Sequence, residues 1–181
     1  MGRQLAKFSG RGYDKGRNRV FQALWVLTSF AIFERLWCPP KFRVFILRGF
    51  GAKVGSGVLI RHGVRIHWPW KLRIGNDVWI GVDAWLLNLE PITIGSDVCI
   101  SQAALLCTGS HDAASDSFEF DNAPITVGDG AWIATQATIL RGVAIGAHSV
   151  IGARALVTGD VPVGARVLAP KALVVTNGNA S

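Results

Sequence analysis

His111 lies in the part of this sequence that is best equipped for chemistry. It stands in a short polar run, Thr-Gly-Ser-His-Asp at residues 108–112, directly behind a long and regular series of aliphatic residues. The ordinary pKa of an imidazole is near neutral, so a histidine can take a proton from a hydroxyl nucleophile as a general base. Asp112 is near enough in the chain to orient the ring. The run therefore predicts a catalytic loop with His111 as its base.

Cys107 offers the same segment a second route. It precedes His111 by four residues, and a cysteine activated by a histidine can carry an acyl group as a covalent intermediate. Direct attack by a hydroxyl needs only the histidine. We favour direct transfer and keep the acyl-cysteine route as the alternative.

The residues that must position this loop repeat with a period of six. Each unit has an aliphatic residue and, in most units, a small or short side chain four positions later; Trp70 is a misfit among the sixteen units. The aliphatic positions are Val54, Ile60, Ile66, Ile74, Ile80, Leu86, Ile94, Ile100, Leu106, Val127, Ile133, Ile139, Ile145, Ile151, Val157 and Val163.

Two inward side chains in every six residues describe a short strand and a corner. Three such units close a coil of eighteen residues, and stacked coils pair as parallel strands around columns of aliphatic side chains. A β-sandwich would instead need two-residue alternation with turns about every 8–12 residues. We therefore predict an all-β fold, a left-handed parallel β-helix of the hexapeptide-repeat type, with a short N-terminal helical arm.

The period is broken three times, each time after a third unit. The spacing lengthens to eight residues before Ile74 and before Ile94, and to twenty-one residues before Val127. Because the breaks recur once per coil, the extra residues should project from one corner, with Asn88 next to the loop of His111. The extra segments are residues 68–70, 88–91 and 108–123.

Beyond the last break the period runs uninterrupted, so residues eighteen positions apart should stack. Thr135, Ala153 and Lys171 form one such column, and Trp132 stands beside it. A row of small residues with an aromatic flank and a terminal cation indicates a track for a long ligand with an anionic end.

The positive charge of the chain is concentrated ahead of the repeat. Residues 1–53 contain eleven Lys and Arg and two Asp and Glu, a net charge of +9 within a total of +7. We expect a loosely tethered leader over residues 1–19, an apolar helix over about residues 20–37 and a basic connector over residues 41–53. The apolar run is shorter than the roughly 20 residues that span a bilayer, so the helix either packs on the domain or lies at a membrane interface.

The chain thus divides into a basic arm (1–53), a β-helix domain (54–170) and a polar tail (171–181). An odd number of cysteines, without metal-ligand spacing and without a signal peptide, favours the reducing cytoplasm. No nucleic-acid-binding motif accompanies the basic arm, so we expect no nucleic-acid partner. An anionic membrane is the alternative to simple solvation of the arm.

Four stretches resemble the colanic acid biosynthesis acetyltransferases, within the hexapeptide-repeat O-acetyltransferases that include maltose, galactoside and nodulation acetyltransferases. They are FGAKVGSGVLI (50–60), HWPWKLRIGNDVWIG (67–81), NLEPITIG (88–95) and SQAALLCTGSHD (101–112). The resemblance covers roughly residues 40–168. It implies a homotrimer that binds acetyl-CoA in a groove between adjacent prisms.

The resemblance also implies roles for individual residues. It makes His111 the general base and Asn88 a polar group of the acceptor pocket, in which we also expect Asp112. The acetyl-CoA contacts it implies are Trp132, Thr135, Ala153 and Lys171. The chain departs from the family at Gly159, where a lysine is frequent, and in residues 168–171, which are one residue shorter than usual. The phosphate contact of Lys171 is therefore left open.

The sequence as a whole predicts an acetyl-CoA-dependent O-acetyltransferase that needs no metal ion. Its acceptor would be a carbohydrate hydroxyl in the synthesis of an exopolysaccharide or another surface glycan, and backbone N–H groups at a corner would stabilise the oxyanion. A lipid-linked acceptor would bring the enzyme to the inner face of the cytoplasmic membrane.

Two other functions remain open at this point. The γ-class carbonic anhydrases use the same β-helix and bind zinc through three histidines, for which His62, His67 and His111 are the candidates, although the repeat puts His62 on a different corner. The second is a trimeric scaffold without catalysis that docks on a membrane through its basic arm.

Overall fold

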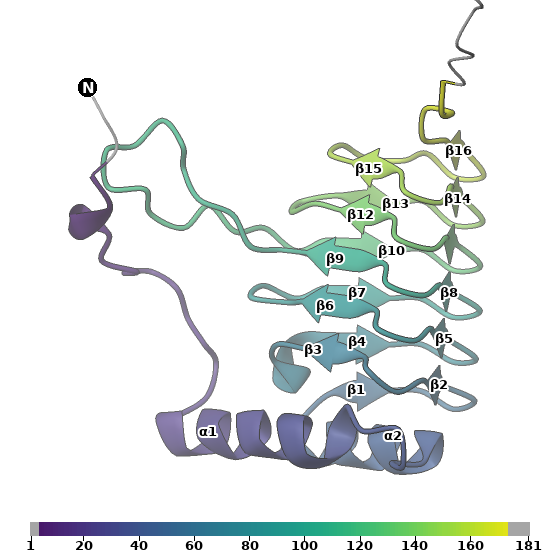
Figure 1. The fold of residues 1–181 in the computed structure, drawn as a ribbon, viewed down its shortest axis with the longest axis horizontal. Coiled ribbons are helices and arrows are strands. Elements are labelled where there is room, and N and C mark those ends of the chain that lie inside the picture. The colour runs from purple at the N-terminus through teal and green to yellow at the C-terminus, as the bar shows by residue number, and fades with distance from the viewer. Residues whose placement is uncertain (1–3, 174–181) are drawn as a thin grey trace, which may run out of the picture.

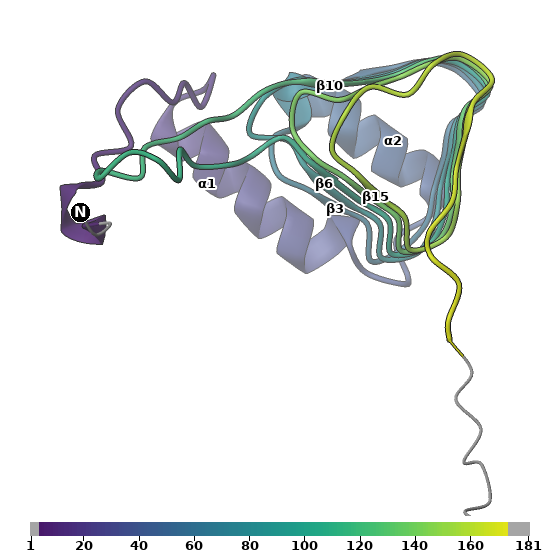
Figure 2. The ribbon, with the colours of Figure 1, turned by 90° about the horizontal axis from the view of Figure 1, so that it is seen from above.

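The computed structural model describes residues 4–173, which form a triangular prism of stacked coils with helices across one end (Figure 1). Seen along its axis, the prism has three flat faces of parallel strands (Figure 2). The predicted left-handed parallel β-helix is confirmed. Of the predicted tail (171–181), residues 174–181 lie outside the described residues, as do residues 1–3.

Each face takes one strand from each of the first five coils, and face B takes a sixth strand from the last coil. Face A contains β1 (Lys53–Val54), β4 (Leu72–Ile74), β7 (Ile92–Ile94), β10 (Ile125–Val127) and β13 (Ala144–Ile145). Face B contains β2 (Leu59–Ile60), β5 (Trp79–Ile80), β8 (Cys99–Ile100), β11 (Trp132–Ile133), β14 (Val150–Ile151) and β16 (Arg166–Val167). Face C contains β3 (Arg65–Ile66), β6 (Trp85–Leu87), β9 (Leu105–Cys107), β12 (Thr138–Ile139) and β15 (Leu156–Val157).

The core is a set of aliphatic columns that run along the prism. On face B, Ile60, Ile80, Ile100 and Ile133 are fully buried, and each pairs in register with the next. Burial of one such side chain contributes about 1.5–3 kcal/mol. A one-residue slip in any coil would turn its aliphatic residue outward, so the columns fix the register of the whole stack.

The register shows where the extra residues leave the prism. Partners on face A are twenty residues apart from β1 to β4 and from β4 to β7, thirty-three apart from β7 to β10, and eighteen apart from β10 to β13. The extra residues project at the corner between faces C and A, as predicted. Asn88 Nδ2–H donates to the Trp68 carbonyl (2.6 Å), and Glu90 N–H donates to Thr108 Oγ1 (2.9 Å), so the three segments are neighbours.

The prediction of an uninterrupted repeat is wrong for the last coil. Val161, not Val163, points inward: Val161 is 5% exposed and Val163 is 72% exposed. The turn between faces C and A is two residues shorter here, so partners on β14 and β16 are sixteen residues apart. This register carries Ala169 to the level above Ala153. Lys171 lies two residues further on, outside the predicted column.

The arm contains more helix than predicted. Its elements are η1 (Leu5–Lys7), α1 (Arg19–Thr28), the π-helical turn η2 (Ser29–Phe33) and α2 (Pro40–Gly49), and η3 (Pro69–Lys71) belongs to the first extra segment. α1 and η2 cover most of the helix predicted over residues 20–37. The predicted basic connector is wrong, because most of it is α2, which a proline at its first position starts without loss of a hydrogen bond.

The helices lie flat across the first coil and close that end of the core (Figure 1). Trp25 is buried, and its indole N–H donates to the carbonyls of Ile66 (3.1 Å) and His67 (3.0 Å). Arg43 is 2% exposed and donates to the carbonyls of Phe33 (2.8 Å) and Ile60 (3.3 Å). Burial lowers the pKa of Arg43. Within residues 4–173, no helix has both the length and the apolar content to cross a bilayer.

Candidate active site

The third extra segment, residues 108–123, is a long two-limbed loop that carries His111 away from the prism (Figures 1 and 2). His111 pairs with Phe120 of the returning limb in an antiparallel bridge. Asp112 N–H donates to the Glu119 carbonyl (2.8 Å). The two limbs therefore support each other, and the loop presents His111 on an ordered backbone.

The imidazole of His111 is held in one tautomer. Nδ1 lies 2.8 Å from the carbonyl oxygen of Phe118. Since a carbonyl oxygen can only accept, Nδ1 carries the hydrogen and Nε2 keeps the lone pair. The ring stacks on Phe118 with a centroid distance of 4.4 Å and an interplanar angle of 6°, and Phe120 lies 5.0 Å away. The ring thus has the orientation and, when neutral, the tautomer that a general base requires.

The leader is bound to this loop rather than loosely tethered, so that prediction is wrong. We call residues 4–15 the strap. The N–H groups of Ser9 (2.8 Å) and Gly10 (3.1 Å) donate to the carboxylate of Glu119, and these bonds lower the pKa of that carboxyl. Gln4 N–H donates to the Asp116 carbonyl (2.9 Å).

Aromatic side chains of the strap extend these contacts to His111. The ring of Phe8 meets the imidazole edge-on at 5.5 Å. Tyr13 packs on Phe120 at 5.0 Å, and its hydroxyl accepts from the Trp68 indole N–H (2.5 Å). Burial raises the pKa of Tyr13 to about 12. The strap thus joins the His111 loop to the first extra segment.

The side chains of Asn88 and Asp112, the predicted acceptor-binding residues, form hydrogen bonds within the protein. Asn88 is fully buried, and its Oδ1 accepts from the N–H groups of His67 and Trp68, both at 3.0 Å. Asp112 is exposed, and its Oδ1 accepts from Ala114 N–H (2.9 Å). The geometry makes Asn88 a support for the corner below the loop. The group that orients the imidazole is the Phe118 carbonyl, not Asp112.

Three of the four predicted acetyl-CoA contacts lie together. Trp132 is 49% exposed on the outside of face B. At the corner between faces B and C, Thr135 Oγ1 donates to the Gln102 carbonyl (2.9 Å), and Arg154 N–H donates to the Thr135 carbonyl (3.0 Å), which brings Ala153 onto the next coil above Thr135. We call Trp132, Thr135 and Ala153 the track.

The track and His111 belong to different corners of the same prism. The His111 loop leaves between faces C and A, whereas the track follows face B and the corner between faces B and C. Lys171 is exposed where the chain leaves the last coil. One chain therefore does not bring the histidine to the track.

A cavity of about 310 Å³ lies at the base of the His111 loop. Its lining residues are Gly109, Ser110, Leu140, Arg141 and Thr158. Arg141 forms an ion pair with Asp121 of the returning limb. Small-molecule sites begin at roughly 300 Å³. The sequence did not point to Arg141, because its unit in the repeat is regular.

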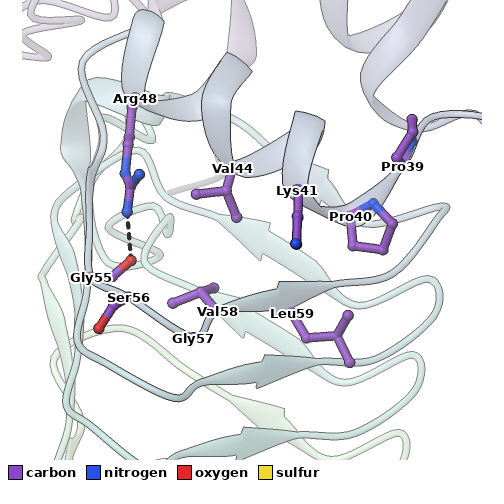
Figure 3. Close-up of a pocket in the computed structure, with 10 residues that line it drawn as sticks. All are labelled: Pro39, Pro40, Lys41, Val44, Arg48, Gly55, Ser56, Gly57, Val58 and Leu59. Carbon is purple, nitrogen blue, oxygen red and sulfur yellow. Dashed lines mark hydrogen bonds between the residues drawn. The ribbon is translucent and has the colours of Figure 1, made fainter.

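A groove of about 830 Å³ lies between α2 and the first coil (Figure 3). Its walls include Pro39, Val44 and Val58, and its charged groups are Lys41 and Arg48. Arg48 donates to the Gly55 carbonyl (2.6 Å). The lining adds the hydroxyl of Ser56 but no histidine, aspartate or glutamate that could act as a base, so the larger volume does not move the candidate site from the His111 loop.

The histidines of the zinc alternative do not assemble into a site. Within residues 4–173, no three His, Cys, Asp or Glu side chains are grouped closely enough to hold a metal ion. His67 packs on Trp68 at 4.3 Å. Burial and, secondarily, the charges of Lys15 and Lys71 lower the pKa of His67 to about 4.

Known proteins place the chain in a family. Residues 124–159 match the family model described as bacterial transferase hexapeptide (six repeats). The putative colanic acid biosynthesis acetyltransferase of Escherichia coli (strain K12) is 42% identical over 161 residues, which cover 87% of each chain. The chain belongs to the hexapeptide-repeat O-acetyltransferases. The resemblance found in the sequence is thereby confirmed.

More distant members of this acetyltransferase family agree with the assignment. The galactoside O-acetyltransferase of Escherichia coli (strain K12) is 28% identical over 123 residues, 66% of this chain and 61% of the relative. Among solved structures, a hexapeptide-repeat acetyltransferase from Vibrio cholerae complexed with acetyl-CoA has a TM-score of 0.79 at 24% identity, over 90% of this chain and 91% of that one. That likeness shows the fold.

The strap contact can be tested at Glu119. Glu119→Gln removes a charged acceptor from the N–H groups of Ser9 and Gly10, so amide hydrogen exchange in residues 5–13 and 111–121 should accelerate at least several-fold. Asp116→Asn is the matched control, because Asp116 contacts the strap through its backbone carbonyl. Because the folded pKa of Glu119 is lowered, wild-type protection should persist above its unfolded pKa and fade as the pH falls through the folded pKa. Unchanged exchange in Glu119→Gln would contradict the contact.

A second prediction concerns His67 and pH. The pKa of His67 is about 4 in the folded protein, against 6.5 for an ordinary histidine. As the pH falls, the unfolded chain therefore binds a proton before the folded chain does. This contribution should lower the free energy of unfolding as the pH falls from about 6.5 to about 4. Urea denaturation of His67→Gln should show a flatter pH dependence than wild type in that window. His148→Gln, which replaces an exposed histidine at a corner, should keep the wild-type pH dependence. Equal pH dependence for His67→Gln and wild type would contradict the argument from the burial of His67.

Proposed function

We propose that this acetyltransferase transfers an acetyl group from acetyl-CoA to a carbohydrate hydroxyl in polysaccharide biosynthesis, with His111 as general base in a homotrimer. The observation that carries the proposal is the hydrogen bond from His111 Nδ1 to the Phe118 carbonyl, which directs the Nε2 lone pair to a substrate. Family membership supports the acetyl donor and the carbohydrate acceptor.

The chemistry follows from the state of the imidazole. As the acceptor hydroxyl attacks the thioester carbonyl, Nε2 takes its proton, and the imidazolium is stabilised by the bond from Nδ1–H to the Phe118 carbonyl. The tetrahedral intermediate then collapses, the C–S bond breaks, and the imidazolium returns the proton to the CoA sulfur. No covalent enzyme intermediate is required. Cys107 is half-buried in β9, and its thiol donates to the Gly109 carbonyl (3.3 Å).

The donor side of the proposal uses the track. Trp132, Thr135 and Ala153 form an exposed edge with an aromatic side chain, suited to an extended ligand such as CoA. Since the His111 loop of the same chain leaves from another corner, the histidine that acts on this donor is supplied by a second copy. A closed trimer gives every track one such loop. Lys171 is not part of this proposal, because it falls outside the column.

The acceptor side uses the cavity at the base of the loop. Ser110, Arg141 and Thr158 offer polar groups for sugar hydroxyls beside His111. Galactoside O-acetylation and colanic acid biosynthesis are the activities for which those relatives are named. For this chain we propose a glycan precursor carried on a lipid at the inner face of the cytoplasmic membrane. No specific observation favours the zinc enzyme or the silent scaffold.

The role of His111 is tested by His111→Asn. Loss of a general base should lower kcat by about 10²–10⁴-fold and leave the Kd for CoA nearly unchanged, because the base acts in the transition state. His148→Asn is the matched control: His148 is exposed at a left-handed corner (φ 57°), a conformation that asparagine accepts. Thiol release from acetyl-CoA with an oligosaccharide acceptor measures kcat, and calorimetry measures CoA binding. Near-wild-type kcat in His111→Asn would reject the assignment.

A further inference from the structure

The helical arm exposes large apolar side chains in addition to those that it buries against the prism. Each of them is between 43% and 78% exposed. We call this set the platform, and its members are Val20, Leu24, Leu27, Phe30, Leu36, Trp37, Phe42 and Phe45. They come from α1, η2, α2 and the segment between η2 and α2. A soluble monomer rarely gathers so many such residues in one place without a partner.

The platform is one surface because each helix has already used its opposite side. In α1 the inward residue is Trp25, and Leu24 and Leu27 are exposed. In α2, Leu47 is buried, and Phe42 and Phe45 stack on each other outside at 5.9 Å. Both helices lie flat in one layer at the same end of the prism, with α2 across the first coil and α1 along its edge (Figures 1 and 2). Their outer sides therefore form one layer at the end of the molecule.

The exposed charges of the arm helices are basic. Arg19 is exposed at the start of α1, and Lys41 and Arg48 are exposed at the groove between α2 and the first coil, where Arg48 also donates to the carbonyls of Val54 and Gly55. Glu34 is half-buried and accepts a hydrogen bond from Ser29 Oγ (2.8 Å). A second copy docked on this surface would bring like charges together. An anionic partner instead complements them, and an apolar layer with a basic rim matches the boundary of a bilayer, where acyl chains meet anionic headgroups.

We propose that the platform docks on an anionic lipid bilayer. The aromatic and aliphatic side chains enter the interface, and the basic side chains meet the headgroups. This deepens the proposed function by assigning the membrane contact to the platform rather than to the leader, whose residues 4–15 are bound to the His111 loop. In the proposed trimer, parallel prisms turn three platforms to the same side, so the contact is multivalent.

The docked orientation also sets how far the acceptor must reach. The His111 loop follows β9, the last strand of the third coil, so a helical layer and two coil rises separate the membrane from its base, roughly 20 Å. A hydroxyl on the first sugar after a lipid phosphate would not extend that far. The geometry therefore selects an acceptor sugar several units from the lipid.

The test uses the full-length protein and vesicles of phosphatidylcholine, with or without phosphatidylglycerol. Wild type should cosediment with the anionic vesicles, more weakly at high salt, and should bind neutral vesicles less. Leu27→Glu with Phe45→Glu replaces two exposed anchors and should reduce binding at least about tenfold. Val163→Glu, an exposed apolar residue at the other end of the prism, is the matched control and should bind like wild type.

A second measurement does not depend on that double variant folding. Brominated lipids should quench tryptophan fluorescence of the wild type more than that of Trp37→Phe, since Trp37 is 66% exposed on the platform. Acetyl transfer to a soluble oligosaccharide should be unchanged in the double variant, which separates this proposal from the proposed function. Equal vesicle binding by the double variant and wild type would overturn the proposal. Absence of binding to both vesicle types would also overturn it. So would a wild-type assembly larger than the proposed trimer that is lost in the double variant.

Discussion

Registered stacking of the coils is the constraint on which the rest of the structure depends. Neighbouring coils share backbone hydrogen bonds on all three faces, and the aliphatic columns inside allow no coil to slip by one residue. Extra residues can therefore leave the prism only at a corner. In this chain the three insertions leave at the same corner, between faces C and A, and that corner holds the candidate active site.

The three insertions at this corner support one another, beginning with the one nearest the arm. The buried amide of Asn88 fixes the backbone of the first insertion, and Thr108 ties the second insertion to the start of the third. The third insertion then carries His111, whose ring is set by a backbone carbonyl and two phenyl rings. The strap holds that loop from outside and continues into α1, so the arm that carries the platform also stabilises the His111 loop.

The period of six was enough to predict the coils, the corner of the insertions and the place of Asn88 beside the loop. It could not predict the short last turn, because Val161 and Val163 are both valines and either fits the pattern. It missed α2 because Lys41, Arg43 and Arg48 divide its apolar residues. The strap and the Phe118 carbonyl could not be read from the sequence, since backbone donors and acceptors carry no residue signature.

The central claim is that a working site needs the His111 loop of one chain and the track of another. Two defective chains test it directly: His111→Asn, and Ala153→Trp, which fills the track. Each should be nearly inactive alone, and trimers assembled from both, verified by two affinity tags, should regain acetyl transfer, because some interfaces combine an intact loop with an intact track. Mixed trimers as inactive as their parents would contradict a site shared between chains.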